Sequence, residues 1–233
     1  MARPHTAWCR NTELKAAFDA LPAGAKGDVG ALEDIIRTRV GIDLDRRKFA
    51  VPASCLRYFG NLKAKQYPNE LAQFLSFLHT KRTEIRSYLE IGAERCGTFY
   101  TVDSYLRSVN PEFQRSTAVD KAKRWCRFRA YQAAYDCRFV RMRSSNYVMD
   151  APADLVLIDG DHSLTGVAAD FRLVCGKARY VALHDTACVG LRYIQVKEFW
   201  EQVKGDYPHC EFLNQDADFP GCLGIGVLLV GAH

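Results

Sequence analysis

The sequence predicts an α/β fold, a doubly wound and mostly parallel β-sheet with helices on both faces and a helical extension before it. From residue 85 onward, short β-prone runs alternate with helical stretches, the pattern of parallel strands joined by crossover helices. The last two runs have no helix between them, so we expect them to pair as an antiparallel hairpin at the sheet edge. We therefore divide the chain into an extension, residues 1–84, and a sheet domain, residues 85–233.

Composition excludes several other classes of protein. The chain has 233 residues, 48% hydrophobic and 25% charged, which is enough to bury a core without disulfides. Its longest apolar run, residues 224–230, has the length of a strand, so no membrane span is expected. The first residues lack the apolar stretch of a secretory signal. Nine cysteines with no C-x-x-C pair predict free thiols and a cytoplasmic location.

The extension reads as helices at residues 12–18, 31–40 and 70–79, the last with apolar residues at helical spacing. Thr12 is a candidate N-cap for the first of them. We expect these helices to act as a lid over the site, which would exclude water, or as an arm that forms a homo-oligomer.

The sheet domain is expected to contain seven strands and four helices. The strands are expected at residues 87–91, 116–119, 138–142, 154–158, 179–183, 211–213 and 225–230. The helices are expected at residues 98–108, in the stretch that follows Asp120, and at residues 164–175 and 195–203.

Residues 115–143 contain nine basic and two acidic residues, a local charge of +7 where the whole chain carries +5. One interpretation is a helix with a solvated basic face and a core face that contains Trp125, Phe128 and Gln132. The other is a groove for phosphates or a nucleic-acid backbone. The sequence leaves both open, and the net charge alone permits an anionic ligand without requiring one.

Ligands of such sheets bind at the carboxyl ends of the strands, which directs attention to the residues that end each one. Glu90, Gly92 and Gly97 follow the first strand, and glycines there let the backbone approach a ligand. The dinucleotide fingerprint G-x-G-x-x-G is absent. Glu90 would suit a ligand with a cationic or hydroxyl-rich end. Asp120 ends the next strand, where it would hold ribose hydroxyls or cap the basic helix.

Two more strand ends carry acids and imidazoles. Asp159, Asp161 and His162 follow the most apolar strand, and His184 and Asp185 end the next. Neighbouring parallel strands would bring all five side chains to one place. Buried acids need partners, and such a group could bind a cation or supply a base. The alternative is structural, with Asp161 or Ser163 capping the following helix.

Three motifs carry a resemblance: LEIGAERCGTF (89–99), LIDGDHSLTGVAADF (157–171) and VALHDTACVGLRYIQVKEFW (181–200). Together they resemble the class I S-adenosylmethionine-dependent methyltransferases, in particular the small-molecule and sugar O-methyltransferases. The resemblance implies a Rossmann-like sheet of seven strands, one of them antiparallel, with S-adenosylmethionine across the first two strand ends. The donor-binding residues that it implies are Glu90, Gly92, Ala93, Gly97, Asp120, Ser144, Ser145 and Asp159.

The same resemblance implies a divalent cation at Asp159, His184 and Asp185. The imidazole would suit Mn²⁺ better than Mg²⁺. The sequence departs from the family pattern at Glu94 and Cys96, where glycines are usual. It departs again at Arg143, near the usual position of an acid that meets the adenine amine, so that Ser144 or Ser145 would have to replace it.

We expect methyl transfer to a hydroxyl group of a small molecule or glycan. Asp159 would lie near the reacting carbon, and His162, or else Asp161, would remove the proton. One alternative is a nucleic-acid or other polyanionic acceptor bound through residues 115–143. Another is a binding protein that keeps the fold without the activity. A nicotinamide dehydrogenase is disfavoured because its glycine fingerprint is missing.

Overall fold

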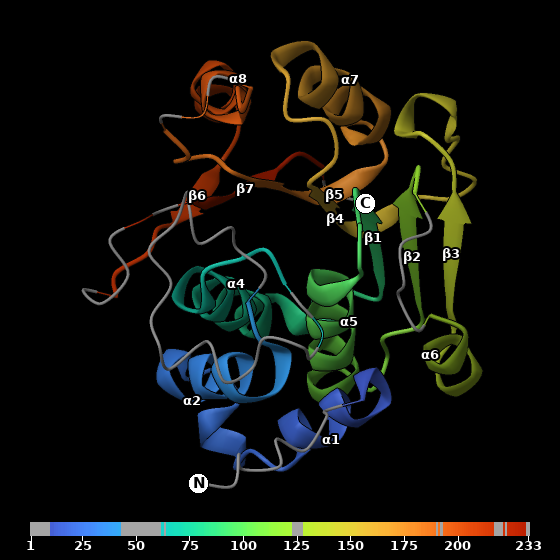
Figure 1. Ribbon diagram of the computed structural model, residues 1–233, viewed down its shortest axis with the longest axis vertical. Coiled ribbons are helices and arrows are strands. Elements are labelled where there is room, and N and C mark those ends of the chain that lie inside the picture. The colour runs from blue at the N-terminus through green and yellow to red at the C-terminus, as the bar shows by residue number, and fades with distance from the viewer. Residues whose placement is uncertain are drawn as a thin grey trace, which may run out of the picture.

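The computed structural model describes residues 10–42, 62, 64–122, 128–189, 191, 193–216, 221 and 223–231. Seven strands form one sheet in the order β3-β2-β1-β4-β5-β7-β6 (Figure 1). The strands are β1 Ser87–Ile91, β2 Arg115–Asp120, β3 Cys137–Arg141, β4 Ala153–Ile158, β5 Ala178–His184, β6 His209–Phe212 and β7 Ile225–Leu229. The α-helices are α1 Leu14–Asp19, α2 Val29–Ile35, α4 Pro68–Lys81, α5 Gly97–Val109, α6 Phe128–Ala134, α7 Leu164–Val174 and α8 Val196–Val203.

The sheet is parallel from β3 through β5 and ends in an antiparallel hairpin. β7 pairs antiparallel with both β5 and β6, which confirms the expected edge hairpin. Ile91 of β1 lies opposite Ile158 of β4, which in turn lies opposite Leu183 of β5. The residues that follow β1, β4 and β5 therefore share one edge of the sheet.

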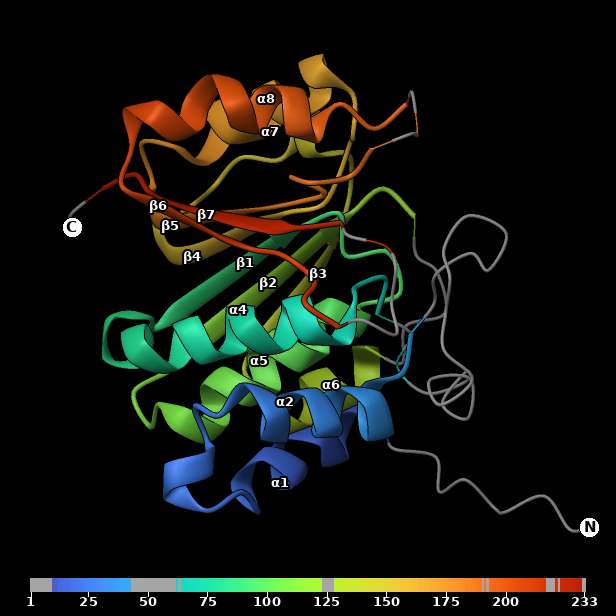
Figure 2. The same cartoon turned by 90° about the vertical axis from the view of Figure 1, so that its left-hand side faces the viewer.

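Helices cover both faces of the sheet (Figure 2). Helices α4, α5 and α6 lie against one face, and α1 and α2 pack outside them. Helices α7 and α8 cover the other face. No helix among the described residues is long and apolar enough to cross a membrane.

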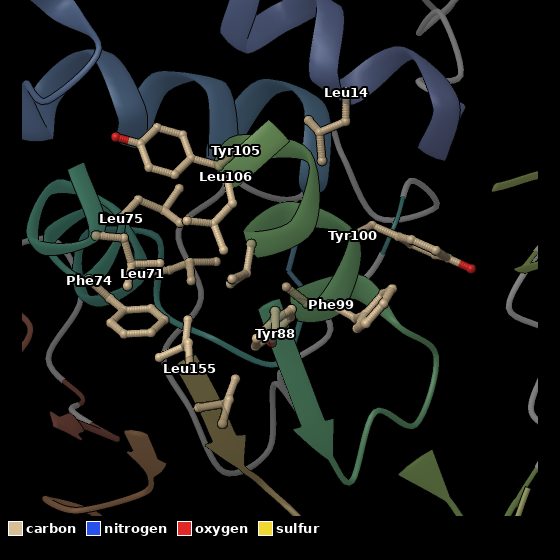
Figure 3. Close-up of a cluster of buried hydrophobic side chains, with 14 of the residues drawn as sticks. Leu14, Leu71, Phe74, Leu75, Tyr88, Phe99, Tyr100, Tyr105, Leu106 and Leu155 are labelled. Carbon is tan, nitrogen blue, oxygen red and sulfur yellow. The ribbon is translucent and has the colours of Figure 1, made fainter. Parts of the chain in front are cut away.

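One hydrophobic cluster joins the first 84 residues to the sheet (Figure 3). Leu71, Phe74 and Leu75 of α4 lie in the same cluster as Tyr88 of β1 and Leu155 of β4. The spacing of these α4 residues is that of a helix with one apolar face, as the sequence predicted. The N-terminal helices thus share their core with the sheet, and their action as a lid stays a prediction.

The basic segment differs in part from its expected form. In α6, Phe128 is buried as predicted, but Gln132 is exposed, so its assignment to the core face was wrong. Tyr131 takes that place and packs on Phe99 and Tyr100, since an aromatic ring gains more from burial than an amide. Trp125, with the rest of 123–127, lies outside the described residues.

Two local structures remain to be compared with the prediction: the start of α1 and the connection from β3 to β4. Thr12 lies inside the 3₁₀ turn Asn11–Glu13 that precedes α1, rather than at its N-cap. Between β3 and β4 the chain makes only a 3₁₀ turn, η5 (Ser144–Asn146), which packs against α7. The turn after β3 therefore lies beside α7.

Candidate functional site

A cavity of about 1110 Å³ opens at the carboxyl ends of β1, β2, β4 and β5. Every residue predicted to bind the donor, bind a cation or act as a base lines it. These are Glu90, Gly92, Ala93, Gly97, Asp120, Ser144, Ser145, Asp159, Asp161, His162, His184 and Asp185. The topology therefore gathers into one space the strand ends that the sequence singled out.

Gly92 is required by a close approach of two strands. Its φ of 92° lies in the left-handed region, and an added Cβ would lie 2.0 Å from the carbonyl oxygen of Asp159. The backbone N–H of Asp159 donates to Ile91 (2.8 Å), and that of Gly92 donates to Val119 (2.8 Å). Glycine at this position thus lets the end of β1 lie directly against the end of β4.

Two further residues of this loop have side chains but adopt backbone conformations that are typical of glycine. Glu94 and Cys96 have φ values of 43° and 64°, in the region that side chains disfavour. Cys96 is the buried residue that precedes α5. The carboxylate of Glu94 pairs with Lys65 at 2.8 Å. The departures from the family pattern therefore keep a tight loop at some cost in backbone strain.

Glu90 is a buried carboxyl beneath the loop. The hydroxyl of Tyr88 donates a hydrogen bond to it. Burial raises the pKa of Glu90 to about 8; the bond from Tyr88 opposes this shift, and Asp159 and Asp120 add to it. A cation beside Glu90 would relieve this electrostatic cost, which suits the charged end of a sulfonium amino acid.

Asp120 ties the end of β2 to the loop that follows β1. One of its carboxylate oxygens accepts from the N–H of Glu94 (2.8 Å) and the other from the N–H of Ala122 (2.7 Å). These bonds fix a carboxylate on the cavity wall, where ribose hydroxyls would meet its remaining lone pairs. The alternative role of Asp120, as a cap of the predicted basic helix, involves residues 123–127, which lie outside the described part of the chain.

Two acids and two imidazoles form a compact cluster at the ends of β4 and β5. His184 Nδ1 lies 3.0 Å from Asp159 Oδ1 and 3.5 Å from Asp185 Oδ1. His162 Nδ1 lies 2.5 Å from Asp185 Oδ2, and its Nε2 lies 3.7 Å from Asp159 Oδ1. The in-register pairing of these strands thus brings together the side chains that the sequence placed at neighbouring ends.

The carboxylates set the charge of the two histidines. Burial opposes a charge on His184, but Asp159 and Asp185 raise its pKa to about 10. For His162, too, burial opposes the charge, and the contacts with Asp185 and Asp159 outweigh it and raise the pKa. His184 is therefore an imidazolium at neutral pH, with no lone pair for a metal.

The donor atoms best placed for a metal come from a different histidine than expected. One ligand atom each of Asp159, His162 and Asp185 lie within 4.8 Å of one another. Two carboxylate oxygens and one imidazole nitrogen fit a divalent cation, and the nitrogen favours Mn²⁺ over Mg²⁺. His184, which the resemblance implied as a ligand, contacts both carboxylates, and its role as a ligand stays a prediction.

Asp161 and Ser163 divide the roles that the sequence left open. Ser163 caps α7 by accepting from the N–H of Gly166 at 3.1 Å. Asp161 accepts from the N–H of Ser163 at 3.0 Å, and this bond lowers its pKa. Asp161 thus stays ionised at the cavity wall, and its lowered pKa makes it a weaker base than His162.

The N-terminal extension supplies residues to the site that the sequence did not single out. The buried carboxylate of Glu70, from α4, accepts from the N–H of Leu223 at 2.9 Å. The N–H of Ala187 donates to the carbonyl of Leu223 at 2.8 Å. This chain of bonds connects α4 to the loop that carries Asp185. Lys65 also lines the cavity.

Sequence reasoning also missed Asp170. It lies on α7, buried at 3% exposure, and lines the cavity. Gly166, Ala169 and Leu173 line the cavity from the same helix. Residues 166, 169, 170 and 173 have the spacing i, i+3, i+4 and i+7, so they lie on one face of the helix. This spacing was the signal in the sequence that could have identified Asp170.

No protein-family model matches the sequence, and no curated protein matches it. Solved structures do match. Cofactor-bound Rv0187 from MTB is 17% identical, with a TM-score of 0.53 over 96% of this chain and 99% of that one. A "putative O-methyltransferase" from Klebsiella pneumoniae is 14% identical, with a TM-score of 0.52 over 100% and 92%. A "putative RNA methyltransferase" from Pyrococcus horikoshii is 9% identical, with a TM-score of 0.53 over 86% and 96%.

The chain has the class I methyltransferase fold. The seven-stranded sheet with its antiparallel β7, implied by the resemblance, is confirmed. At these identities the likeness concerns the fold, and it does not transfer an acceptor or a metal to this chain.

Proposed function

We propose that this protein is an S-adenosylmethionine-dependent methyltransferase that acts on a hydroxyl group of a small molecule or glycan. One observation carries the proposal. A single cavity joins Glu90, a buried carboxyl that a sulfonium donor would favour in its ionised form, to a cluster of acids and imidazoles that includes Asp159. Its volume of about 1110 Å³ is large enough for a donor and an acceptor together.

The donor would lie across the ends of β1 and β2. Glu90, Gly92, Ala93 and Gly97 would surround its methionine end, and Asp120 would accept from the ribose hydroxyls. Ser144 and Ser145 line the same cavity from the turn after β3. Asp159 would lie beside the departing methyl group, because its backbone contacts the loop that holds the methionine end.

The chemistry is an in-line displacement. The acceptor oxygen forms a bond to the methyl carbon, the bond from that carbon to sulfur breaks, and S-adenosylhomocysteine leaves. The acceptor proton passes to His162, which Asp185 orients through their 2.5 Å contact. Alignment of the reactants accounts for up to about 7–11 kcal/mol of the barrier, and a base adds about 10²–10⁴-fold in rate.

A bound divalent cation would change these roles. Asp159, His162 and Asp185 would hold it, and Asp161 would then be the base. The cation would lower the pKa of the acceptor hydroxyl. Thermal unfolding with Mn²⁺, with Mg²⁺ and with a chelator separates the two versions, because only a bound ion raises the melting temperature.

The acceptor side of the cavity favours a small molecule. Leu191, Ile194 and Leu223 supply apolar surface there, and Tyr193 is 59% exposed beside them. Lys65 supplies a cation that pairs with Glu94. This combination fits an acceptor with an apolar ring or chain and one polar or anionic group.

One observation favours a polyanionic acceptor instead. Lys121 and Arg143, from the basic segment, line the cavity, and Arg141 is exposed nearby in the sequence. Binding of a labelled RNA oligonucleotide at increasing salt separates the two readings. A polyanion site loses affinity steeply with salt, whereas a small-molecule site changes little.

Calorimetry with S-adenosylmethionine and S-adenosylhomocysteine tests the donor site. We expect saturable binding that Asp120→Ala weakens. Absence of heat at millimolar ligand would support a binding protein that has lost the donor site. Formation of S-adenosylhomocysteine with a panel of phenols, sugars and glycosides then tests the reaction. Turnover that survives both Asp159→Asn and His162→Ala would refute the mechanism.

The location and the assembly state stay predictions. Cys137, Cys175, Cys188 and Cys210 are free thiols in the structure. Free thiols are typical of a reducing cytoplasm, where we expect the protein to act. Sedimentation of the purified chain would test whether it forms a homo-oligomer.

A further inference from the structure

Asp170 occupies an unusual place for an acid. Its side chain is 3% exposed, yet it lines the cavity from the middle of α7. Gly166, Ala169 and Leu173 line the cavity from the same face of the helix, and the exposed Arg172 lines it beside them. The face therefore offers a nearly apolar surface with one carboxyl set into it.

The carboxyl of Asp170 is incompletely satisfied. Its Oδ2 atom has no hydrogen-bond partner in the described part of the structure. Burial raises the pKa of Asp170, and the nearby acid Asp161 adds to the shift, while Ser144 and the backbone of Asp161 offset part of it. A buried acceptor without a partner costs about 1–3 kcal/mol or more, so a ligand that supplies a donor would gain affinity here.

The environment indicates which donor that is. Ser144, which interacts with Asp170, belongs to the turn after β3, and this turn packs against α7. On the proposed donor pose, the ribose lies at Asp120, and the base extends from there toward this turn. Arg143, at the place where an acid would otherwise meet the base, has no acceptor to offer. Adenine presents an amino group as its only exocyclic donor.

We propose that Asp170 accepts a hydrogen bond from the exocyclic amine of the donor's adenine, with Ala169 and Leu173 against the ring. This inference rests on the proposed function, since it assigns one end of the same donor. The glycine at position 160 leaves room for the Asp170 carboxyl, because a Cβ there would lie 2.9 Å from Asp170 Oδ2.

The test compares two nucleosides that differ at the edge of the base that would meet Asp170. S-inosylhomocysteine has a carbonyl at C6 where S-adenosylhomocysteine has the amine, and its N1 carries a hydrogen where that of adenine accepts one. We expect calorimetry to show that the wild-type protein prefers the adenosyl compound by about 10- to 100-fold, the worth of one bond to a charged acceptor. In Asp170→Asn, whose amide donates as well as accepts, the preference falls below about threefold.

The controls separate recognition from folding. Asp150→Asn makes the same chemical change at an exposed acid outside the cavity, and it leaves the preference intact. Asp170→Ala lowers affinity for the adenosyl compound alone. Equal weakening of both compounds, or an unchanged preference in Asp170→Asn, would overturn this inference and leave the donor site standing. Failure of the wild-type protein to bind either compound would overturn both.

Discussion

Replacement of Gly92 by alanine tests the close contact between the ends of β1 and β4. The new Cβ would lie 2.0 Å from the carbonyl oxygen of Asp159 and 2.6 Å from Cα of Gly160, and both are backbone atoms. Overpacking of this kind costs about 1–3 kcal/mol. A φ of 92° adds a further cost of about 1–2 kcal/mol for a residue with a side chain.

The two costs together predict that Gly92→Ala loses about 2–5 kcal/mol of unfolding free energy. For a chain of this length, that corresponds to a fall in melting temperature of about 5–15 °C. Urea unfolding followed by circular dichroism measures the free energy directly. The displaced Asp159 backbone should also move its carboxylate away from His184, so binding of S-adenosylhomocysteine should weaken at a temperature where the variant is folded.

Gly176→Ala is the matched control. A Cβ at Gly176 meets no atom within 4 Å, and its φ lies outside the left-handed region, so this variant should unfold within about 0.5 kcal/mol of the wild-type protein. If Gly92→Ala were as stable as this control, the two strand ends would not lie as close as described, and the placement of Asp159 would be refuted.

Three further predictions concern buried charge and the proposed base. The pKa of Glu90 is raised to about 8 from its ordinary 4.5, so the folded protein holds a proton that the unfolded chain loses, and stability falls as pH rises between these values. Glu90→Gln should therefore be more stable than the wild-type protein at pH ~9, by at most about 5 kcal/mol, with the difference gone near pH ~4.5; equal melting temperatures at both pH values would contradict this. His162→Gln should lower kcat by about 10²–10⁴-fold while leaving donor affinity unchanged. Because the pKa of His162 is raised, the wild-type rate should keep rising with pH beyond its ordinary value of 6.5, and the variant should lose that rise. Asp103, fully buried, pairs with Arg107 at 2.8 Å and accepts from Tyr131 at 2.5 Å, so Asp103→Asn should cost about 3–5 kcal/mol in urea unfolding.

Local sequence patterns were sufficient for the elements and for most of the site. The strands and helices after residue 85 appear where hydrophobic periodicity placed them, because each buries one face or one apolar run. The gathering of Asp159, His162, His184 and Asp185 followed from a single rule, that parallel strands end at one edge. This rule needs only the order of neighbouring strands, which the alternating pattern supplies.

The features that the sequence could not supply depend on three-dimensional direction. The sequence does not show which of two imidazoles turns its nitrogen toward an open space, and the structure directs His162 there while His184 bridges two carboxylates. Gln132 and Tyr131 are neighbours in the chain, and their burial depends on the rotation of a short helix against Phe99. Asp170 escaped notice because acids on a helix are ordinarily solvated, and only the cavity makes this one different.

On the proposed function, the bonds that run from Glu70 to Leu223 and on to Ala187 have a consequence for how the acceptor space would change in evolution. Three stretches, far apart in the chain, are bonded together at the proposed acceptor wall, whereas the proposed donor wall is formed by the loops after β1 and β2, the turn η5 and helix α7. We therefore expect substitutions in α4 to alter the proposed acceptor space without changing donor affinity. If a new acceptor were selected, we would expect the substitutions in and around α4, far along the chain from the proposed base His162.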